Sequence, residues 1–442
     1  MNNNFPEQFP TPGQSGSSPQ RVKRMRLRDT RVLSVVIAFA VLVLASALTA
    51  LLVLRPAHLP AHASGGAPTP TPTVSTPAPG QPLPHGSLYI AAAGSLARVD
   101  LKTDNVLWTL QASVPLAPLV MGNTLFYENG DTTDAFLAAV NAKTGAQLWH
   151  TQQYPAGFLL GAGNELYDSA CDLSATSDPC HLYGINASTG AQLWSYDLPH
   201  GNAWIAFQHG ILYGVSYTSY FALNALTGTP LWQKDLLNYP DQEANMTPVV
   251  SGNVLSFASC NTTKQSSGFA GCYLYAFNAS TGEELWHLST TSTFAATPSI
   301  MGGVIYAGTI DGMLYALNEQ DGAQLWSAHA GGTVGQLLAR AGAVYVETIG
   351  ADGQTLHIEA FNAATHTPIW GQVSDSGATV LLADRSTRSA GPASHPFVLD
   401  RGLIYLQSGP TTIAVLKASD GSQVTQYTAS ETTINGFTVS AQ

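Results

Sequence analysis

The residues with the most distinctive chemistry are four cysteines in two local pairs, Cys171 with Cys180 and Cys260 with Cys272. A cysteine serves as a metal ligand, a nucleophile or half of a disulfide. Neither pair has Cys-x-x-Cys spacing, and no histidine pair stands at zinc-finger distance, so the pattern argues against a metal site. In an oxidising compartment we expect two loop-closing disulfides; elsewhere the four residues would be small buried thiols.

An acidic turn, Glu128, Asp131 and Asp134, offers oxygen ligands for a weakly bound cation, although a solvated hairpin is the better interpretation. The 12 histidines share no spacing, and His287 and His329 are expected at the surface. The chain contains no Gly-x-Ser-x-Gly elbow, His-Glu-x-x-His motif, phosphate-binding loop or EF-hand loop. The sequence therefore predicts no catalytic, cofactor-binding or metal-binding residue.

One repeated phrase, such as NASTGAQLW ending at Trp194, organises the elements that position these residues. Copies recur every 38 to 55 residues, and an eighth copy has Thr425 in place of tryptophan. Such periods without helical patterning predict a β-propeller. We expect the tryptophans to fill the gaps between blades rather than to stack against a ligand. They are Trp108, Trp149, Trp194, Trp232, Trp286, Trp326 and Trp370.

Each phrase opens with a turn in which asparagine bonds its own backbone and glycine takes the left-handed corner. Asn186 and Asn278 also stand in glycosylation sequons. The turn role is the better interpretation, because the same asparagine recurs where no sequon exists. The turn glycines are Gly145, Gly190, Gly228, Gly282, Gly322 and Gly421.

Between phrases, four short β-rich runs separated by Gly-Gly or Asp-Gly turns predict a four-stranded meander, strands A to D. Residues 86–442 are therefore predicted to form an all-β, eight-bladed β-propeller of four-stranded antiparallel blades. The first blade lacks its own strand A. We expect the tail, residues 436–442, to pair with residues 88–92 and close the ring.

The N-terminal part is of a different kind. Residues 1–31 are predicted to be a disordered, basic cytoplasmic tail, and residues 55–85 a Pro/Ala/Thr-rich linker. Residues 32–54 carry no charge and would give about 34 Å of helix, enough to cross a membrane. The basic cluster before this run favours a cytoplasmic N-terminus and an extracytoplasmic propeller. Cleavage as a signal peptide near Ala61–Ala63 is the alternative.

The propeller is acidic, with ten Lys and Arg against 26 Asp and Glu, a net charge of about −16. Because an acidic body repels phosphate backbones, nucleic acid is not expected as a partner.

Long insertions fall in the B–C and D–A connections, which lie on one face of a meander. Long loops on a rigid framework usually carry binding, so this face is the predicted partner-binding surface, with tolerated insertions as the alternative. The candidate contacts are Tyr239, Asp241, Glu243, Arg385 and Arg388.

The array of Ala-x-Thr-Gly-x-x-x-Trp turns resembles the pyrroloquinoline-quinone (PQQ) propeller repeat over residues 86–442. The resemblance implies one of two groups: quinoprotein dehydrogenases, which bind PQQ and calcium over the axis, or non-catalytic proteins similar to the assembly lipoprotein BamB. The dehydrogenases typically carry adjacent cysteines, which this chain lacks, so the BamB-like group is favoured. The chain differs from BamB as well, because a spanning helix replaces the lipid anchor.

We therefore expect a membrane-anchored, extracytoplasmic, non-catalytic scaffold or envelope assembly factor that binds a protein or another cell-envelope component without a cofactor. The alternatives are a dehydrogenase dependent on PQQ and calcium, and an extracellular ligand sensor.

Overall fold

The computed structural model describes residues 86–441, apart from residues 93, 131–135, 152–157, 172–179, 199–200, 217–218, 237–241, 244–245, 262–271, 351–355, 372–396, 410 and 430–432. The chain divides into two units, residues 1–69 and 70–442, and every described residue belongs to the second. The predicted tail, spanning helix and linker lie outside the described residues. Within the described part, no helix has the length and hydrophobicity to cross a membrane.

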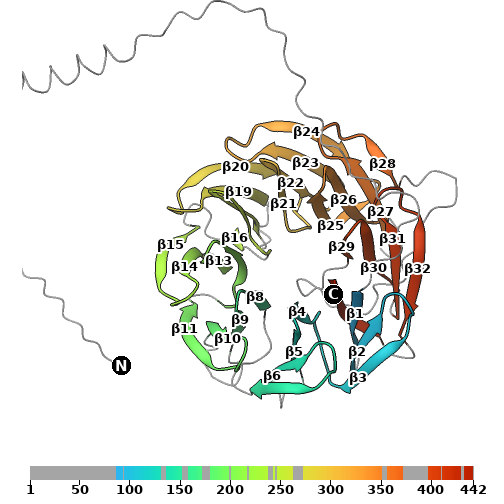
Figure 1. The fold of residues 1–442 in the computed structure, drawn as a ribbon. Coiled ribbons are helices and arrows are strands. Elements are labelled where there is room, and N and C mark those ends of the chain that lie inside the picture. The colour runs from blue at the N-terminus through green and yellow to red at the C-terminus, as the bar shows by residue number, and fades with distance from the viewer. Residues whose placement is uncertain are drawn as a thin grey trace, which may run out of the picture. The chain divides into compact units, whose positions relative to one another are not determined.

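The described residues form 33 strands in eight antiparallel sheets, arranged as the blades of a ring (Figure 1). This confirms the predicted eight-bladed propeller. Blade 1 contains β1 (Gly86–Ala92), β2 (Ser95–Asp100), β3 (Val106–Gln111) and the C-terminal β33 (Ile434–Ala441). Blade 2 contains β4 (Leu119–Met121), β5 (Thr124–Asn129), β6 (Phe136–Asn141) and β7 (Gln147–Thr151). Blade 3 contains β8 (Phe158–Ala162), β9 (Glu165–Cys171), β10 (Cys180–Asn186) and β11 (Gln192–Leu198).

The remaining blades follow in chain order. Blade 4 contains β12 (Trp204–Gln208), β13 (Ile211–Ser216), β14 (Ser219–Asn224) and β15 (Pro230–Asp235). Blade 5 contains β16 (Gln242–Glu243), β17 (Val249–Ser251), β18 (Val254–Asn261), β19 (Cys272–Asn278) and β20 (Glu284–Thr290). Blade 6 contains β21 (Ser299–Met301), β22 (Val304–Gly308), β23 (Met313–Asn318) and β24 (Gln324–His329). Blade 7 contains β25 (Thr333–Arg340), β26 (Ala343–Ile349), β27 (Leu356–Asn362) and β28 (Pro368–Trp370), and blade 8 contains β29 (Phe397–Asp400), β30 (Leu403–Gly409), β31 (Thr412–Lys417) and β32 (Gln423–Thr428).

Burial changes across each blade from strand B to strand D. In blade 2, four successive residues of strand B, Leu125 to Glu128, are buried, because both faces of the strand pack against neighbouring blades. Strand D of blade 1 instead alternates between exposed and half-buried residues. The period-2 alternation of the sequence therefore marks the outer strands, and continuous apolar runs mark the inner ones.

The C-terminal strand closes the ring, as the sequence predicts. β33 pairs antiparallel with β1 in the register Leu88↔Val439 and Ile90↔Phe437. Figure 1 shows the C-terminal end beside β1. Ile434 and Phe437 are 0% and 2% exposed, so this strand brings core residues as well as backbone hydrogen bonds to blade 1.

Blade 5 departs from the predicted four strands. Its D–A connection forms a fifth strand, β16, which pairs with the end of β18 through Gln242↔Asn261 and Glu243↔Cys260. Strand A of this blade, β17, covers only the other end of β18. β18 has eight residues and β17 has three. The end of β18 that β17 does not cover pairs with β16 instead.

The two faces of the ring differ in the regularity of their connections. Every A–B turn between described strands has two residues, and every C–D turn has five. The B–C connections range from two to ten residues and the D–A connections from three to 26. We call the face with the A–B and C–D turns the turn face, and the face with the B–C and D–A connections the loop face.

Candidate binding face and the seams that support it

Each tryptophan of the repeated phrase reaches across the seam, the interface between one blade and the next. Its indole Nε1 donates to a backbone carbonyl in the C–D turn of the following blade, which satisfies a polar group inside an otherwise apolar contact. The pairs are Trp108–Ala142 (3.1 Å), Trp149–Ala187 (2.9 Å), Trp194–Ala225 (2.9 Å), Trp232–Ala279 (3.0 Å), Trp286–Glu319 (3.0 Å), Trp326–Ala363 (3.0 Å) and Trp370–Ala418 (2.8 Å).

The turn glycine of the following blade lies directly against the same indole. Gly190 has a φ of +73°, and a Cβ atom placed on it would lie 2.6 Å from Cε3 of Trp149. The glycine is therefore required both by the left-handed backbone and by the close approach of the ring. Gly145, Gly228, Gly282, Gly322 and Gly421 show the same arrangement. At the seam between blades 6 and 7, His366 replaces the glycine with a φ of 52°, and its ring centroid is 5.7 Å from that of Trp326.

The seam between blades 8 and 1 lacks a tryptophan, and a tyrosine takes its place. Tyr427, two residues beyond Thr425 and therefore on the same side of β32, donates its hydroxyl to Leu101 O at 3.0 Å. Leu101 occupies the turn position of the alanine carbonyls in the other seams. Burial, followed by the Asp104 carboxylate, raises the pKa of Tyr427, so this hydroxyl remains a donor. The repeated phrase did not reveal this residue, because it lies outside the phrase.

The turn asparagines act through their side chains on the turn itself. Asn141 Oδ1 accepts hydrogen bonds from the backbone N–H groups of Lys143 and Thr144, both at 3.0 Å. Asn186 and Asn278, which stand in sequons, accept the same pair of bonds. The predicted role in the turn is therefore present at the sequons too.

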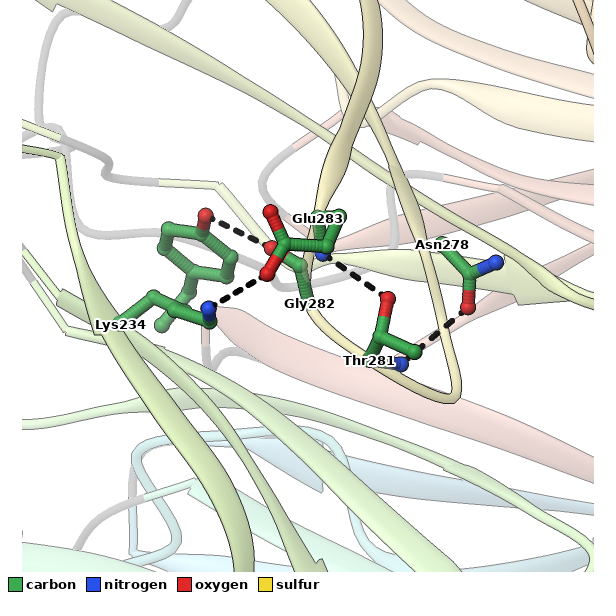
Figure 2. Close-up of polar contacts among 6 residues, drawn as sticks. Lys234, Asn278, Thr281, Gly282 and Glu283 are labelled. Atoms are coloured by element: carbon green, nitrogen blue, oxygen red, sulfur yellow. Dashed lines mark hydrogen bonds and ion pairs between the residues drawn. The ribbon is translucent and has the colours of Figure 1, made fainter. Parts of the chain in front are cut away.

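The seam between blades 4 and 5 carries additional polar contacts (Figure 2). Tyr220 donates its hydroxyl to Gly282 O at 3.0 Å, and Lys234 Nζ lies 2.7 Å from Glu283 Oε1. Both groups of the ion pair are partly exposed, so its contribution is small, about 0–1 kcal/mol. These contacts hold the C–D turn of blade 5 against blade 4 on the turn face. On the opposite loop face, the same blade carries the additional strand β16.

Both predicted disulfides are present, Cys171–Cys180 and Cys260–Cys272. In each, the two cysteines are direct partners in the pairing of strands B and C, in blades 3 and 5. Each disulfide therefore closes the base of a long B–C connection. In blade 5, β16 pairs with Cys260 itself, so two connections of the loop face are anchored at one disulfide.

Of the five candidate contact residues, only Glu243 falls on a described element, as the second residue of β16. Its backbone pairs with that of Cys260. Tyr239, Asp241, Arg385 and Arg388 lie outside the described residues. The structure thus places one candidate in a strand anchored beside a disulfide on the loop face.

Among the described residues, four buried carboxyl groups have the chemistry that proton transfer or cation binding would need. Glu128, Glu347 and Glu359 are 5%, 3% and 6% exposed, and Asp168 is 0% exposed. Burial raises the pKa of Asp168 to about 7, and burial raises the pKa of Glu359 against the opposing effect of a hydrogen bond from the Gly331 backbone. The interpretation of Glu128 as part of a solvated hairpin is wrong, because strand B continues through this residue into the core.

Among the described residues, no group of three or more His, Cys, Asp or Glu side chains is arranged to hold a metal ion. His287 is exposed at the surface, as expected, with Nδ1 2.6 Å from Glu284 Oε1. The described cysteines form disulfides at the bases of two loops and not the adjacent-cysteine bridge that is typical of the quinoprotein dehydrogenases.

Comparisons with known proteins place this geometry in a family. BamB of Yersinia pestis is 33% identical over 110 residues, which are 24% of this chain and 26% of that protein. A tetrathionate hydrolase of Acidithiobacillus ferrooxidans is 28% identical over 139 residues, 28% of each chain. The chain thus matches about a quarter of the length of these curated relatives.

The structure of AztD from Citrobacter koseri shares the fold, with a TM-score of 0.53 at 11% identity over 81% of this chain and 98% of that one. A family model described as outer membrane protein assembly factor BamB matches residues 63–203, 180–271 and 270–438. Together with the eight blades and their tryptophan seams, this match shows that the chain belongs to the BamB family of propellers.

Proposed function

We propose that this protein is a non-catalytic scaffold of the cell envelope that binds another protein through its loop face. The observation that carries the proposal is the contrast between the two faces. The A–B turns are all of one length and the C–D turns all of another, whereas the lengths of the B–C and of the D–A connections differ fivefold or more. Two disulfides and an added strand anchor the long connections of blades 3 and 5. Variable loops on a rigid framework are the usual location of binding. The family supports an assembly role, since its description names an assembly factor.

We also propose that residues 32–54 anchor the chain in a membrane with the propeller on the extracytoplasmic side. Two disulfides within the propeller support an oxidising compartment. The test is to fuse alkaline phosphatase to the C-terminus in cells. We expect an active fusion that stays in the membrane fraction, and an inactive or fully released fusion would contradict the anchor.

Photo-crosslinking in cells tests the binding face. Ile310, in the B–C connection of blade 6, is 44% exposed on the loop face, and Leu226, in a C–D turn, is 68% exposed on the turn face. We expect p-benzoylphenylalanine at Ile310 to capture a discrete envelope protein, and the same group at Leu226 to capture none. Capture from Leu226 alone would contradict the proposal.

The non-catalytic part of the proposal has its own test. The full chain is incubated with PQQ and Ca²⁺, separated from free quinone and assayed for dye reduction with alcohols and sugars. We expect no retained chromophore and no reduction. Retained quinone with turnover would establish the dehydrogenase alternative.

A further inference from the structure

The most unusual polar group in the described residues is the carboxyl of Asp168. It lies in β9 with no exposed surface, and neither of its oxygens has a hydrogen-bond partner. A buried carboxyl group without a partner is unfavourable, because it loses its hydration and receives nothing in exchange. Such groups are retained where they hold a proton, a water molecule or a cation.

Asp168 faces the seam between blades 2 and 3. Its two strand partners, Leu159 and Tyr183, both pack in the apolar cluster that fills this seam. Leu166, two residues earlier in the same strand, belongs to that cluster as well. Since side chains alternate along a strand, Asp168 points toward blade 2.

Blade 2 presents a second carboxyl group to the same seam. Glu128 lies two residues after Phe126, and its strand partner is Leu137; both neighbours belong to the cluster between blades 2 and 3. Counted from the A–B turn, Glu128 is the fifth residue of β5 and Asp168 the fourth of β9. The offset is about one residue, roughly 3.4 Å, and packed sheets lie about 10 Å apart, so the two side chains reach toward one another across the seam.

We propose that Glu128 and Asp168 form a binding site for one hard divalent cation, such as Ca²⁺, inside the seam between blades 2 and 3. The pair supplies oxygen atoms only and two negative charges, the donor set that hard divalent cations prefer. The cation gives the unpartnered oxygens of Asp168 a ligand role and neutralises the buried charge. Ca²⁺ takes six to eight oxygen ligands, so water and backbone carbonyls complete the shell.

The chain contains a matched control for this site. Glu347 occupies the same place in β26 as Glu128 in β5, the fifth residue of strand B, and it is equally buried. The next blade presents Leu406, the fourth residue of β30, where blade 3 presents Asp168. The facing strand therefore offers no second carboxylate at this position, and the replacement of Glu347 should leave cation binding intact.

The test compares the full chain with the variants Asp168→Asn, Glu128→Gln and Glu347→Gln at pH 7.5, with a chelator or with saturating CaCl₂. We expect Ca²⁺ to raise the melting temperature by roughly 2 °C or more in the wild type and in Glu347→Gln. Calorimetry should give one Ca²⁺ per chain. Affinity should fall about tenfold at pH 5.5, because protons compete for the carboxylates. Both seam variants should lose the response.

Two results would overturn the site. One is a wild-type melting temperature that is the same with chelator and with Ca²⁺. The other is an equal Ca²⁺ response in the wild type and in Glu128→Gln. Because Glu128→Gln keeps the side-chain volume, this variant tests the site even if Asp168→Asn fails to fold.

Discussion

At the scale of single residues, the seams depend on one contact repeated around the ring: an aromatic donor from strand D, a carbonyl from the next C–D turn, and a small residue in the left-handed corner. The indole Nε1 of Trp194, for example, donates to Ala225 O at 2.9 Å, and Gly228 lies beneath the ring. The contact combines buried area with a satisfied polar group. Its components can therefore be removed one at a time.

The glycine contribution is isolated by comparing Gly190→Ala with Gly163→Ala. Both positions have positive φ, but a Cβ on Gly163 meets nothing within 4 Å, whereas one on Gly190 meets Trp149. We expect Gly163→Ala to lower the free energy of unfolding by about 1–2 kcal/mol, the backbone penalty alone. Gly190→Ala should lower it by about 1–3 kcal/mol more, through overpacking. Urea denaturation measures both, and equal losses would contradict the packing role.

The hydroxyl of Tyr427 is tested by Tyr427→Phe, which leaves Leu101 O without this donor. We expect a loss of about 1–3 kcal/mol in the free energy of unfolding. Thr425→Ser, a change at the position that tryptophan holds in the other blades, is the control and should change stability by less than about 0.5 kcal/mol. If the two variants denature alike, Tyr427 does not replace the missing tryptophan.

At the scale of elements, β33 differs from all other strands because it completes a blade whose remaining strands lie at the opposite end of the described residues. Its pairing with β1 joins the last described residues to the first, with Tyr89↔Thr438 at the centre of the register. An unpaired inner edge on blade 1 would otherwise expose backbone groups to aggregation. The strand therefore determines whether the blades form a closed ring.

The contribution of β33 is measured through Phe437, which is 2% exposed. We expect Phe437→Ala to lower the free energy of unfolding by about 3–5 kcal/mol. The control is Phe207→Ala on β12, where the ring is 37% exposed and the loss should be much smaller.

Deletion of residues 434–442 should abolish a single cooperative melting transition. Unchanged cooperativity after the deletion would show that the strand is dispensable.

At the scale of the whole molecule, the ring combines a turn face with uniform turns and a loop face with connections of very different lengths. The stable seams beside the turn face allow the loops on the other face to vary. Eight similar seams distribute the packing, so an unfavourable group in one seam is tolerated. The buried carboxyl of Asp168 is such a group.

The pH dependence of unfolding reports this group. The pKa of Asp168 is about 7 in the folded protein, raised by burial, against an ordinary value of 3.8. Between these values the folded state binds the additional proton, so stability falls as pH rises from about 4 to about 7 and then levels off. Among the described residues, the other titratable groups facing this seam include Glu128, Tyr183 and His181, which lies two residues before Tyr183 in β10 and contacts Asp197.

In chelator, we expect Asp168→Asn to remove a decrease on the order of 4 kcal/mol or less over this range. Urea denaturation of the wild type and the variant from pH 4 to pH 8 measures the difference. Parallel pH profiles would mean that Asp168 does not carry the proton.

The sequence by itself determined the blades, their number, the ring closure and which cysteines lie close enough to pair. The reason is that these features depend on local spacing: a turn of fixed length, a tryptophan at constant distance and cysteines close in sequence. The tertiary structure alone decided what meets across a seam, because those neighbours come from different repeats. It brought Tyr427 to Leu101 and turned Glu128 and Asp168 toward one interface, and it paired β16 with the free end of β18. Glu128 was assigned to solvent from its acidic turn, whereas burial on both faces of strand B places it in the core.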